Sequence, residues 1–229
     1  MISIIVPVLN EEATLGATLV HLTRACPDCE ILVVDGGSTD QTVDIAQRYA
    51  RVLVSAPGRG QQMNVGATAA AGDILWFVHA DTEVDAKAAS EIRQALADPA
   101  TIGGGLTLAF HDSSLSLAIV AGLSNLRART LHWIFGDQSL FVRRSVFESL
   151  GGFPVLPLME DLEMSRRLNR CGRLVLLGAM SRTSARRFRD GGIWRVLWRM
   201  QYLKAGYLLG VPPAKLHARY VQTTPKRGR

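Results

Sequence analysis

Cysteine is scarce in this chain of 229 residues, and long apolar runs are missing. Three cysteines are too few, and odd in number, for a disulfide framework. Cys26 and Cys29 have C-x-x-C spacing, but no second pair of zinc ligands accompanies them, so we interpret them as structural thiols. No apolar stretch reaches the ~18 residues that a membrane-spanning helix needs. Pro7 and two following acidic residues interrupt the first apolar segment, so we expect no signal peptide and a cytoplasmic protein.

Acidic residues are nearly missing from the last fifth of the chain. Residues 1–181 contain 14 Lys/Arg and 19 Asp/Glu, whereas residues 182–229 contain 12 Lys/Arg and a single acidic residue, Asp190. The formal net charge is +6. A basic segment of this kind can meet phosphates, nucleic acid or an anionic membrane surface. No helix-turn-helix, zinc-finger or RNA-binding signature is present, so we expect no nucleic-acid partner.

Apolar β-branched segments alternate with helix-like segments in the first half of the chain. The segment 74–78 contains no charge, as expected for a strand buried on both faces. The alternation predicts an α/β fold with a mostly parallel sheet flanked by helices. The predicted strands are 3–8, 31–34, 52–54 and 74–78, and the predicted helices are 11–24 (with Asn10 as N-cap), 40–49, 61–71 and 87–97.

The second half of the chain is less regular. Residues 193–209 have apolar side chains at helical spacing. No internal repeat or linker divides the chain. The other predicted elements are strands at 106–110, 138–142 and 174–177 and helices at 115–133 and 160–169.

Polar side chains follow three strands of the predicted sheet. Asn10 and Glu11 follow the first strand, Asp35 follows the second, and His79 and Asp81 follow the fourth. In an open parallel sheet, ligands bind beyond the carboxyl ends of the strands. We therefore expect these side chains to converge at one edge of the sheet.

Taken in order, the motifs of this chain resemble family 2 glycosyltransferases, which have the GT-A fold. The resemblance covers about residues 2–170, and the His-Ala-Asp-Thr form of one motif is similar to that of a small bacterial subgroup. It implies a hexosyltransferase that uses a UDP- or GDP-linked sugar. We expect a GT-A-like domain over 1–190, an amphipathic helical extension over 191–222 and a disordered tail over 223–229. The motifs are SIIVPVLNEE (3–12), VDGGSTD (34–40), GRGQQMNVGA (58–67), GD (72–73), HAD (79–81), GDQS (136–139), GGF (151–153) and ED (160–161).

The resemblance also implies roles on the donor side. It places Asp35 against a base N–H and Arg59 near the base and phosphates. One of Arg186 and Arg187 would contact the diphosphate from a mobile loop, since the Arg fork suits phosphate; a solvated loop is the alternative. The residues assigned to nucleotide binding are Pro7, Asn10, Glu11, Asp35, Arg59, Asp73 and His79.

The metal-binding motif of the family departs from its usual form here. The usual Asp-x-Asp reads His79-Ala80-Asp81, so the resemblance implies one carboxylate ligand, Asp81, for Mn²⁺ or Mg²⁺. A hard cation can complete its shell with diphosphate oxygens and water. His79 would suit Mn²⁺ if it were a ligand. The alternatives for His79 are a hydrogen bond to the ribose and a purely structural hydrogen bond.

The catalytic residues implied by the resemblance are Asp161, as general base of an inverting displacement, and Glu160 beside it. A base needs a pKa near the working pH, and a pair of carboxylates can raise one of the two pKa values. Helix N-capping is the alternative for this pair. Asp137 and Gln138 are assigned to the acceptor or the transferred sugar, with a plain turn as the alternative.

Two questions stay open at the level of sequence. The helix at 193–209 carries aromatic and basic residues, and it lies either on an anionic membrane or against the sheet or a second subunit, as in a homodimer. The acceptor is a polyprenyl phosphate or other lipid-linked group, a glycan, a small metabolite or a protein. Other interpretations of the chain are a nucleotidyltransferase and a non-catalytic, partner-binding or membrane-binding module on a degenerate transferase scaffold.

Overall fold

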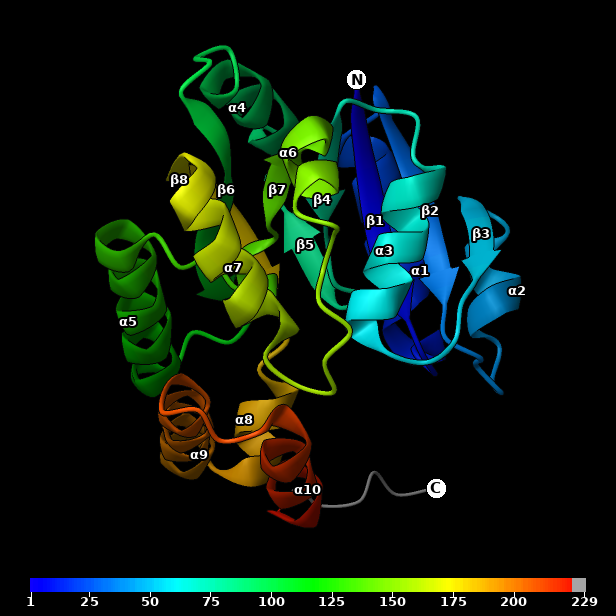
Figure 1. The fold of residues 1–229 in the computed structure, drawn as a ribbon. Helices are drawn as coiled ribbons and strands as arrows, with labels where there is room; N and C mark the ends of the chain where they lie inside the picture. Colours follow the sequence, from blue (N-terminus) through cyan, green and yellow to red (C-terminus); the bar gives the residue numbers. More distant parts are fainter. Residues whose placement is uncertain (224–229) are drawn as a thin grey trace.

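The structure is a computed structural model and describes residues 1–223, apart from the side chains of residues 187, 222 and 223. Eight strands form one sheet, in the order β3-β2-β1-β4-β7-β6-β8-β5 (Figure 1). The strands are β1 (Ile2–Val8), β2 (Cys29–Asp35), β3 (Arg51–Val54), β4 (Ile74–Phe77), β5 (Thr82–Val84), β6 (Thr101–Phe110), β7 (Phe141–Arg143) and β8 (Arg173–Thr183). The helices are α1 (Glu12–Ala25), α2 (Thr42–Ala46), α3 (Arg59–Ala69), α4 (Ala88–Ala95), α5 (Leu115–Leu131), the 3₁₀ helix η1 (Gly136–Gln138), α6 (Arg144–Ser149), α7 (Glu160–Cys171), α8 (Arg186–Gly191), α9 (Ile193–Leu208) and α10 (Pro213–Thr223).

The first half of the chain forms the parallel part of the sheet, as predicted. β1 pairs in parallel with β2 on one side and with β4 on the other, and β2 pairs in parallel with β3. The carboxyl ends of β1, β2 and β4 therefore meet at one edge of the sheet. Asn10 is not the N-cap that we expected: α1 begins at Glu12, and the Asn10 side chain instead accepts a hydrogen bond from the N–H of Thr39 (2.8 Å).

The second half of the chain adds mixed pairing. β7 is antiparallel to both β4 and β6, β8 is parallel to β6, and β5 is antiparallel to β8. The predicted strand at 138–142 is wrong at its start, because Gln138 ends η1 and the strand begins at Phe141. β6 begins at Thr101, five residues before the predicted 106, because the glycines at 103–105 carry no side chains to signal a buried strand.

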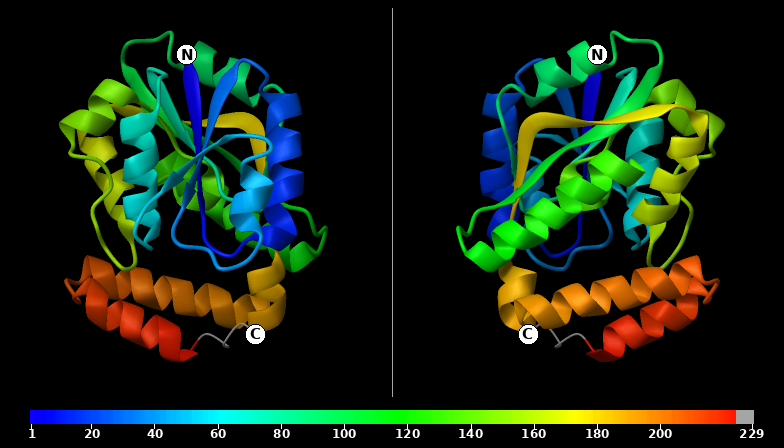
Figure 2. Two further views of the ribbon diagram at one scale, coloured as in Figure 1. Left: turned by 90° about the vertical axis from the view of Figure 1, so that its right-hand side faces the viewer. Right: turned by 90° about the vertical axis from the view of Figure 1, so that its left-hand side faces the viewer.

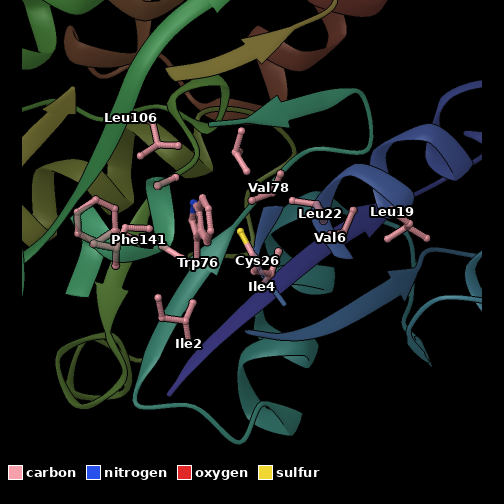
Figure 3. Packing of buried hydrophobic residues seen from close by; sticks show 14 of the residues in the cluster. Ile2, Ile4, Val6, Leu19, Leu22, Cys26, Trp76, Val78, Leu106 and Phe141 are labelled. Carbon is pink, nitrogen blue, oxygen red and sulfur yellow. The ribbon is translucent and has the colours of Figure 1, made fainter. Parts of the chain in front are cut away.

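The core has two layers, one on each face of the sheet. Along β1, Ile4 and Val6 belong to one buried cluster, whereas Ile5 belongs to the other, because successive side chains point to opposite faces. Trp76 is fully buried in the first cluster, and its indole N–H donates to the Ser139 carbonyl (Figure 3). Helices α1 and α4 cover this face and α3 and α7 cover the other, so the central strands are buried on both faces (Figure 1).

Helix α3 approaches the sheet closely at Gly66. A β-carbon at this position would lie 2.4 Å from Cγ2 of Ile5, so only glycine lets the helix pack at this depth. The approach matters for function because α3 carries Arg59 in its first turn.

Helices α8, α9 and α10 form a separate layer below the carboxyl edge of the sheet (Figure 2). A third buried cluster, which includes Phe135, Met159, Leu162 and Leu203, joins this layer to η1 and to the start of α7. Among residues 1–223, no helix is both long and apolar enough to cross a membrane.

Candidate active site

A cleft of about 240 Å³ lies between the sheet and the C-terminal helices. The carboxylates of Asp81, Asp137 and Asp161 line it together with Arg59 and His79, although these residues are up to 102 positions apart in the sequence. The opposite wall is apolar and includes Leu203 of α9 and other side chains of the C-terminal layer. The further lining residues are Phe110, Phe135, Leu158, Met159, Leu162, Thr183, Ser184, Phe188, Met200, Lys204 and Tyr220.

Arg59 joins the first turns of two helices. Its Nε donates a short hydrogen bond to Glu160, and its Nη2 lies 3.7 Å from Oδ2 of Asp161. Both carboxylates belong to the first turn of α7, where the helix dipole favours negative charge. The preceding residue, Met159, has a left-handed backbone (φ 71°), which is uncommon for a residue with a side chain. The sharp turn at Met159 therefore begins α7 at the cleft.

The environment of Asp161 keeps it ionised. Burial alone would raise the pKa of Asp161, but Arg59 and the backbone N–H groups of Gly136 (3.3 Å) and Leu162 (2.8 Å) outweigh burial and lower it. The pKa of Arg59 is raised in turn, because Glu160 and Asp161 outweigh the effect of burial. We expected the paired carboxylates to raise one pKa of the pair, and for Asp161 this expectation is wrong because a cation lies beside it.

Gly136 lies close to His79 on one side and donates to Asp161 on the other. A β-carbon at Gly136 would lie 2.6 Å from Nε2 of His79, so a larger residue would displace the imidazole. Burial and the charge of Arg59 lower the pKa of His79, against the opposite effect of the aspartates in the cleft. The ring is therefore neutral at pH 7, the form in which it can hold a hydrogen bond or a metal ion.

The residues of the cleft fit a metal ion that shares its ligands with a substrate. Oδ1 of Asp137 is buried and has no hydrogen-bond partner, and Oδ1 of Asp81 has a long contact to the hydroxyl of Thr183 (3.4 Å). Within the described part of the chain, no three His, Cys, Asp or Glu side chains form a metal site by themselves. Mg²⁺ is commonly held by one or two carboxylates plus substrate phosphates. Asp81 and Asp137 suit such an arrangement.

The polar residues after β1 and β2 are bonded mainly to each other. The buried carboxylate of Asp35 accepts hydrogen bonds from the backbone N–H of Gly37 (2.9 Å) and of Ser38 (3.0 Å), which closes the turn after β2. The Glu11 carboxylate lies 3.8 Å from the Arg186 guanidinium, so the start of α8 reaches back to the loop after β1. The structure thus brings Arg186 to the loop after β1 but not to the cleft wall.

Four further assigned residues lie away from the cleft or outside the described residues. Asp73 precedes β4, at the opposite edge of the sheet, where its exposed carboxylate pairs with the N-terminal amine of Met1 (3.3 Å). Gln138 is fully buried, and its side-chain oxygen accepts from Arg127 of α5 (2.7 Å). The side chain of Arg187 lies outside the described residues. Pro7 lies in β1 opposite Val34, beyond the segment that pairs with β4.

A group of cationic and aromatic residues at the cleft was not predictable from the sequence. The ring of Phe135 lies between two cations, with Cζ of Arg127 3.7 Å and Nζ of Lys204 4.6 Å from its centre. Such stacking holds a cation in place against an aromatic face. Lys204 lies in the helix that we predicted at 193–209, and its place in the cleft depends on how α9 packs. No pattern in the sequence reports that packing.

The chain matches a known protein family over more than half of its length. Residues 3–147 match Glycosyl transferase family 2. A PGL/p-HBAD biosynthesis glycosyltransferase of Mycobacterium tuberculosis is 42% identical over 90 residues, which cover 35% of each chain. The Probable glycosyltransferase YdaM of Bacillus subtilis is 22% identical over 227 residues, which cover 87% of this chain and 53% of YdaM. The chain thus spans about a third to a half of the length of these relatives.

Solved structures share the fold. The mannosyltransferase PcManGT from Pyrobaculum calidifontis, in complex with GDP-Man and Mn²⁺, superposes with a TM-score of 0.69 at 18% identity and covers 100% of this chain and 65% of its own. Staphylococcus aureus TarS, in complex with UDP-GlcNAc, superposes with a TM-score of 0.63 at 18% identity and covers 80% of this chain and 58% of its own. The fold of this chain is therefore GT-A-like, with a mixed, mostly parallel sheet and C-terminal helices.

Proposed function

Because this chain belongs to glycosyl transferase family 2, and is thus an enzyme of the kind that uses nucleotide-sugar donors, we propose that it catalyses inverting, metal-dependent transfer of a hexose from UDP or GDP. One observation supports this proposal above the others: Asp81, Asp137, Asp161 and Arg59 line a single cleft. We assign the chain to the small bacterial subgroup with His79-Ala80-Asp81-Thr82. We also keep 1–190 as the transferase domain and 191–222 as its helical extension, while the tail at 223–229 lies almost entirely outside the described residues.

The leaving group of this reaction is a nucleoside diphosphate, which gains negative charge as the glycosidic bond breaks. A divalent ion supplies charge stabilisation for this step, and Mn²⁺ is bound by the mannosyltransferase of the same fold. Asp81 would hold the ion, with the unpartnered oxygen of Asp137 as a second ligand or as an acceptor for a sugar hydroxyl. His79, neutral at pH 7, would hydrogen-bond the ribose or join the ligands. Arg186 would reach the diphosphate from the start of α8.

The base and ribose would bind at the loops after β1 and β2. Pro7, Asn10 and Glu11 lie at the end of β1, and Asp35 lies at the end of the adjacent strand β2. Both oxygens of Asp35 already accept hydrogen bonds from its own turn, Oδ2 from the N–H of Gly37 and Oδ1 from the Ser38 hydroxyl, so a base N–H would have to share one of them. We therefore propose that Asp35 shapes this pocket as much as it contacts the base.

Asp161 would accept the proton of the attacking hydroxyl, with Glu160 holding Arg59 beside it. In the free protein Arg59 lowers the pKa of Asp161, which makes it a weak base. A diphosphate in the cleft offers Arg59 a second anionic partner and draws part of its charge from Asp161. Donor binding would then raise the basicity of Asp161 before the acceptor is attacked.

Thermal unfolding with UDP and with GDP, each with and without Mn²⁺, tests the proposal, because a ligand that binds only the folded state raises Tm. We expect a rise in Tm that needs both a nucleotide and Mn²⁺. Asp81→Asn should abolish the Mn²⁺-dependent part of the rise. Asp73→Asn is the matched control, since Asp73 is an exposed carboxylate at the other edge of the sheet. Wild-type protein with the same Tm under all four conditions would contradict the proposal.

A further inference from the structure

Helix α9 exposes a row of aromatic side chains to solvent. Trp194, Trp198 and Tyr202 lie four residues apart, on one face of the helix, and are 50%, 74% and 59% exposed. Val196 and Leu203 of the same helix are buried, and Leu203 lines the cleft. Large aromatic side chains are usually at least half-buried in a soluble protein, so a row of three this exposed marks an interaction surface.

Helix α5 continues this apolar surface. It contacts α9, and both helices lie on the same side of the molecule (Figure 2, right). Its outward face repeats apolar residues at helical spacing, and Leu115 at its start is 78% exposed. We call the two faces together the α5–α9 surface. Its apolar members are Leu115, Ile119, Leu123, Leu126, Trp194, Trp198 and Tyr202, with Leu208 and Leu209 at the end of α9.

The charge of the helices around the α5–α9 surface has one sign. None of α5, α9 and α10 contains an Asp or Glu, whereas each contains Lys or Arg. Arg129, Arg195, Lys215 and Arg219 are exposed, and Arg219 also donates to the Tyr202 hydroxyl (2.7 Å). The occupant of an apolar surface with a basic border must carry negative charge.

We propose that the α5–α9 surface docks on an anionic phospholipid bilayer, with the aromatic row at the headgroup level and the basic residues on lipid phosphates. Trp and Tyr favour this depth because each has an apolar ring and a polar handle. A second copy of the chain fits less well, because a two-fold contact through this surface would bring its basic borders together. The docked helices lie in the plane of the interface.

Docking would place the cleft close to the lipid. Met200, Leu203 and Lys204 of α9 line the cleft from the side turned away from the aromatic row. If the proposed transferase function holds, an acceptor carried by a lipid would lie close to the cleft that contains Asp161. This consequence rests on the proposed function, whereas docking itself does not.

Vesicle co-sedimentation of the full chain tests docking. We expect binding to vesicles that contain about one third phosphatidylglycerol in phosphatidylcholine, weaker binding to phosphatidylcholine alone, and loss of binding at high salt. Trp194→Ser/Trp198→Ser should weaken partitioning by about tenfold or more and remove the vesicle-induced blue shift of tryptophan fluorescence. Tyr49→Ser/Val54→Ser is the matched control, because these side chains are 43% and 77% exposed near β3, across the molecule.

A charge variant separates lipid from protein partners. Arg129→Gln/Arg195→Gln/Lys215→Gln should weaken binding to anionic vesicles by about tenfold and leave binding to phosphatidylcholine unchanged. Wild-type protein that stays in the supernatant with both vesicle types overturns docking, as does a Trp194→Ser/Trp198→Ser variant that binds like wild type. A stable dimer in light scattering that this variant dissociates would assign the surface to a second copy instead. The nucleotide-dependent rise in Tm should be the same in all these variants, so failure of docking is distinct from failure of the transferase proposal.

Discussion

The loops after β1 and β2 differ from the cleft in how their polar side chains are used. In the loops, Asn10, Asp35 and Thr42 make hydrogen bonds to neighbouring backbone groups and tie the two strand ends together. In the cleft, Oδ1 of Asp137 has no partner and the pKa values of His79 and Asp161 are shifted. Both regions contain residues that the sequence assigned to the same donor site.

The difference indicates that the loop residues hold the shape of the site, whereas the cleft residues carry its chemistry. Side chains whose bonds are made within the protein set the shape of a pocket, and their loss lowers stability. Side chains with an unpaired oxygen or a pKa shifted by burial are the candidates for chemistry, and an unpaired buried oxygen costs stability. Variants in the two regions should therefore fail in different ways.

The largest effect should come from Asp161→Asn in the cleft. Removing a general base typically lowers kcat by about 10²–10⁴-fold. Asn still offers an oxygen to the N–H of Gly136 but loses the charge that pairs with Arg59, so Tm should fall only slightly. Turnover is measured as nucleotide release from whichever of UDP-glucose, UDP-GlcNAc and GDP-mannose the wild type uses.

Glu163→Gln is the control for this variant. Glu163 is in the first turn of the same helix, but it pairs with Arg166 and Arg167 and lies outside the cleft lining. Its activity should stay within about twofold of wild type, because Gln keeps an oxygen for Arg166, Arg167 and the Tyr207 hydroxyl and the cleft is untouched. Equal losses in the two variants would mean that α7 acts through its fold and not through Asp161.

The next largest effect is a loss of stability in Asp35→Ala, which we compare with Asp137→Ala. Asp35→Ala leaves two backbone N–H groups in the turn after β2 without their charged acceptor, and should lower the free energy of unfolding by about 2–3 kcal/mol. Asp137→Ala removes an oxygen that has no partner and should cost little stability. It should, however, reduce the Mn²⁺-dependent rise in Tm with UDP or GDP.

Urea unfolding and thermal shift measure the two quantities on the same samples. A lower stability of Asp137→Ala than of Asp35→Ala would contradict the proposed difference between the loops and the cleft. The proposed difference gains support if Asp35→Asn, which keeps one acceptor oxygen, recovers most of the stability that Asp35→Ala loses.

The sequence predicted the parallel half of the fold well, since strong apolar periodicity and strand-to-helix turns are local signals. It missed β5 and α6 and began β6 late, because short elements and glycine-rich strands depend on tertiary pairing. At the site, the position after a strand predicted Asp81 and the family resemblance predicted Asp161, and both line the cleft. The direction of side chains was not predictable. Gln138 points to Arg127 of α5, and Lys204 lines the cleft only because α9 packs below it.

Arg59→Gln should change how stability depends on pH. A carboxylate with a lowered folded pKa adds stability above its unfolded pKa, and this stability is lost as pH falls through the folded pKa. Without Arg59 the pKa of Asp161 rises, because burial then dominates. Urea unfolding between about pH 3 and 7 should show the acid loss of stability at a higher pH in Arg59→Gln than in wild type.

Arg59→Lys is the informative partner of this variant. Lysine keeps the positive charge near Glu160 and Asp161 but lacks the fork of the guanidinium. It should restore most of the acid stability. The same acid profile in wild type and Arg59→Gln would show that the hydrogen bonds from Gly136 and Leu162, and not Arg59, hold the pKa of Asp161 down.

The smallest effect is expected at Asp73, which the sequence placed in the nucleotide site. Its carboxylate is exposed and pairs with the N-terminal amine, and six steps along the chain at ~3.3 Å each separate it from His79 at the other edge of the sheet. An exposed pair of this kind contributes about 0–1 kcal/mol. Asp73→Ala should therefore keep wild-type turnover and the wild-type Mn²⁺-dependent rise in Tm. A clear loss of either would mean that the donor extends to Asp73 at the opposite edge of the sheet. The proposed separation between structural loops and chemical cleft would then be wrong.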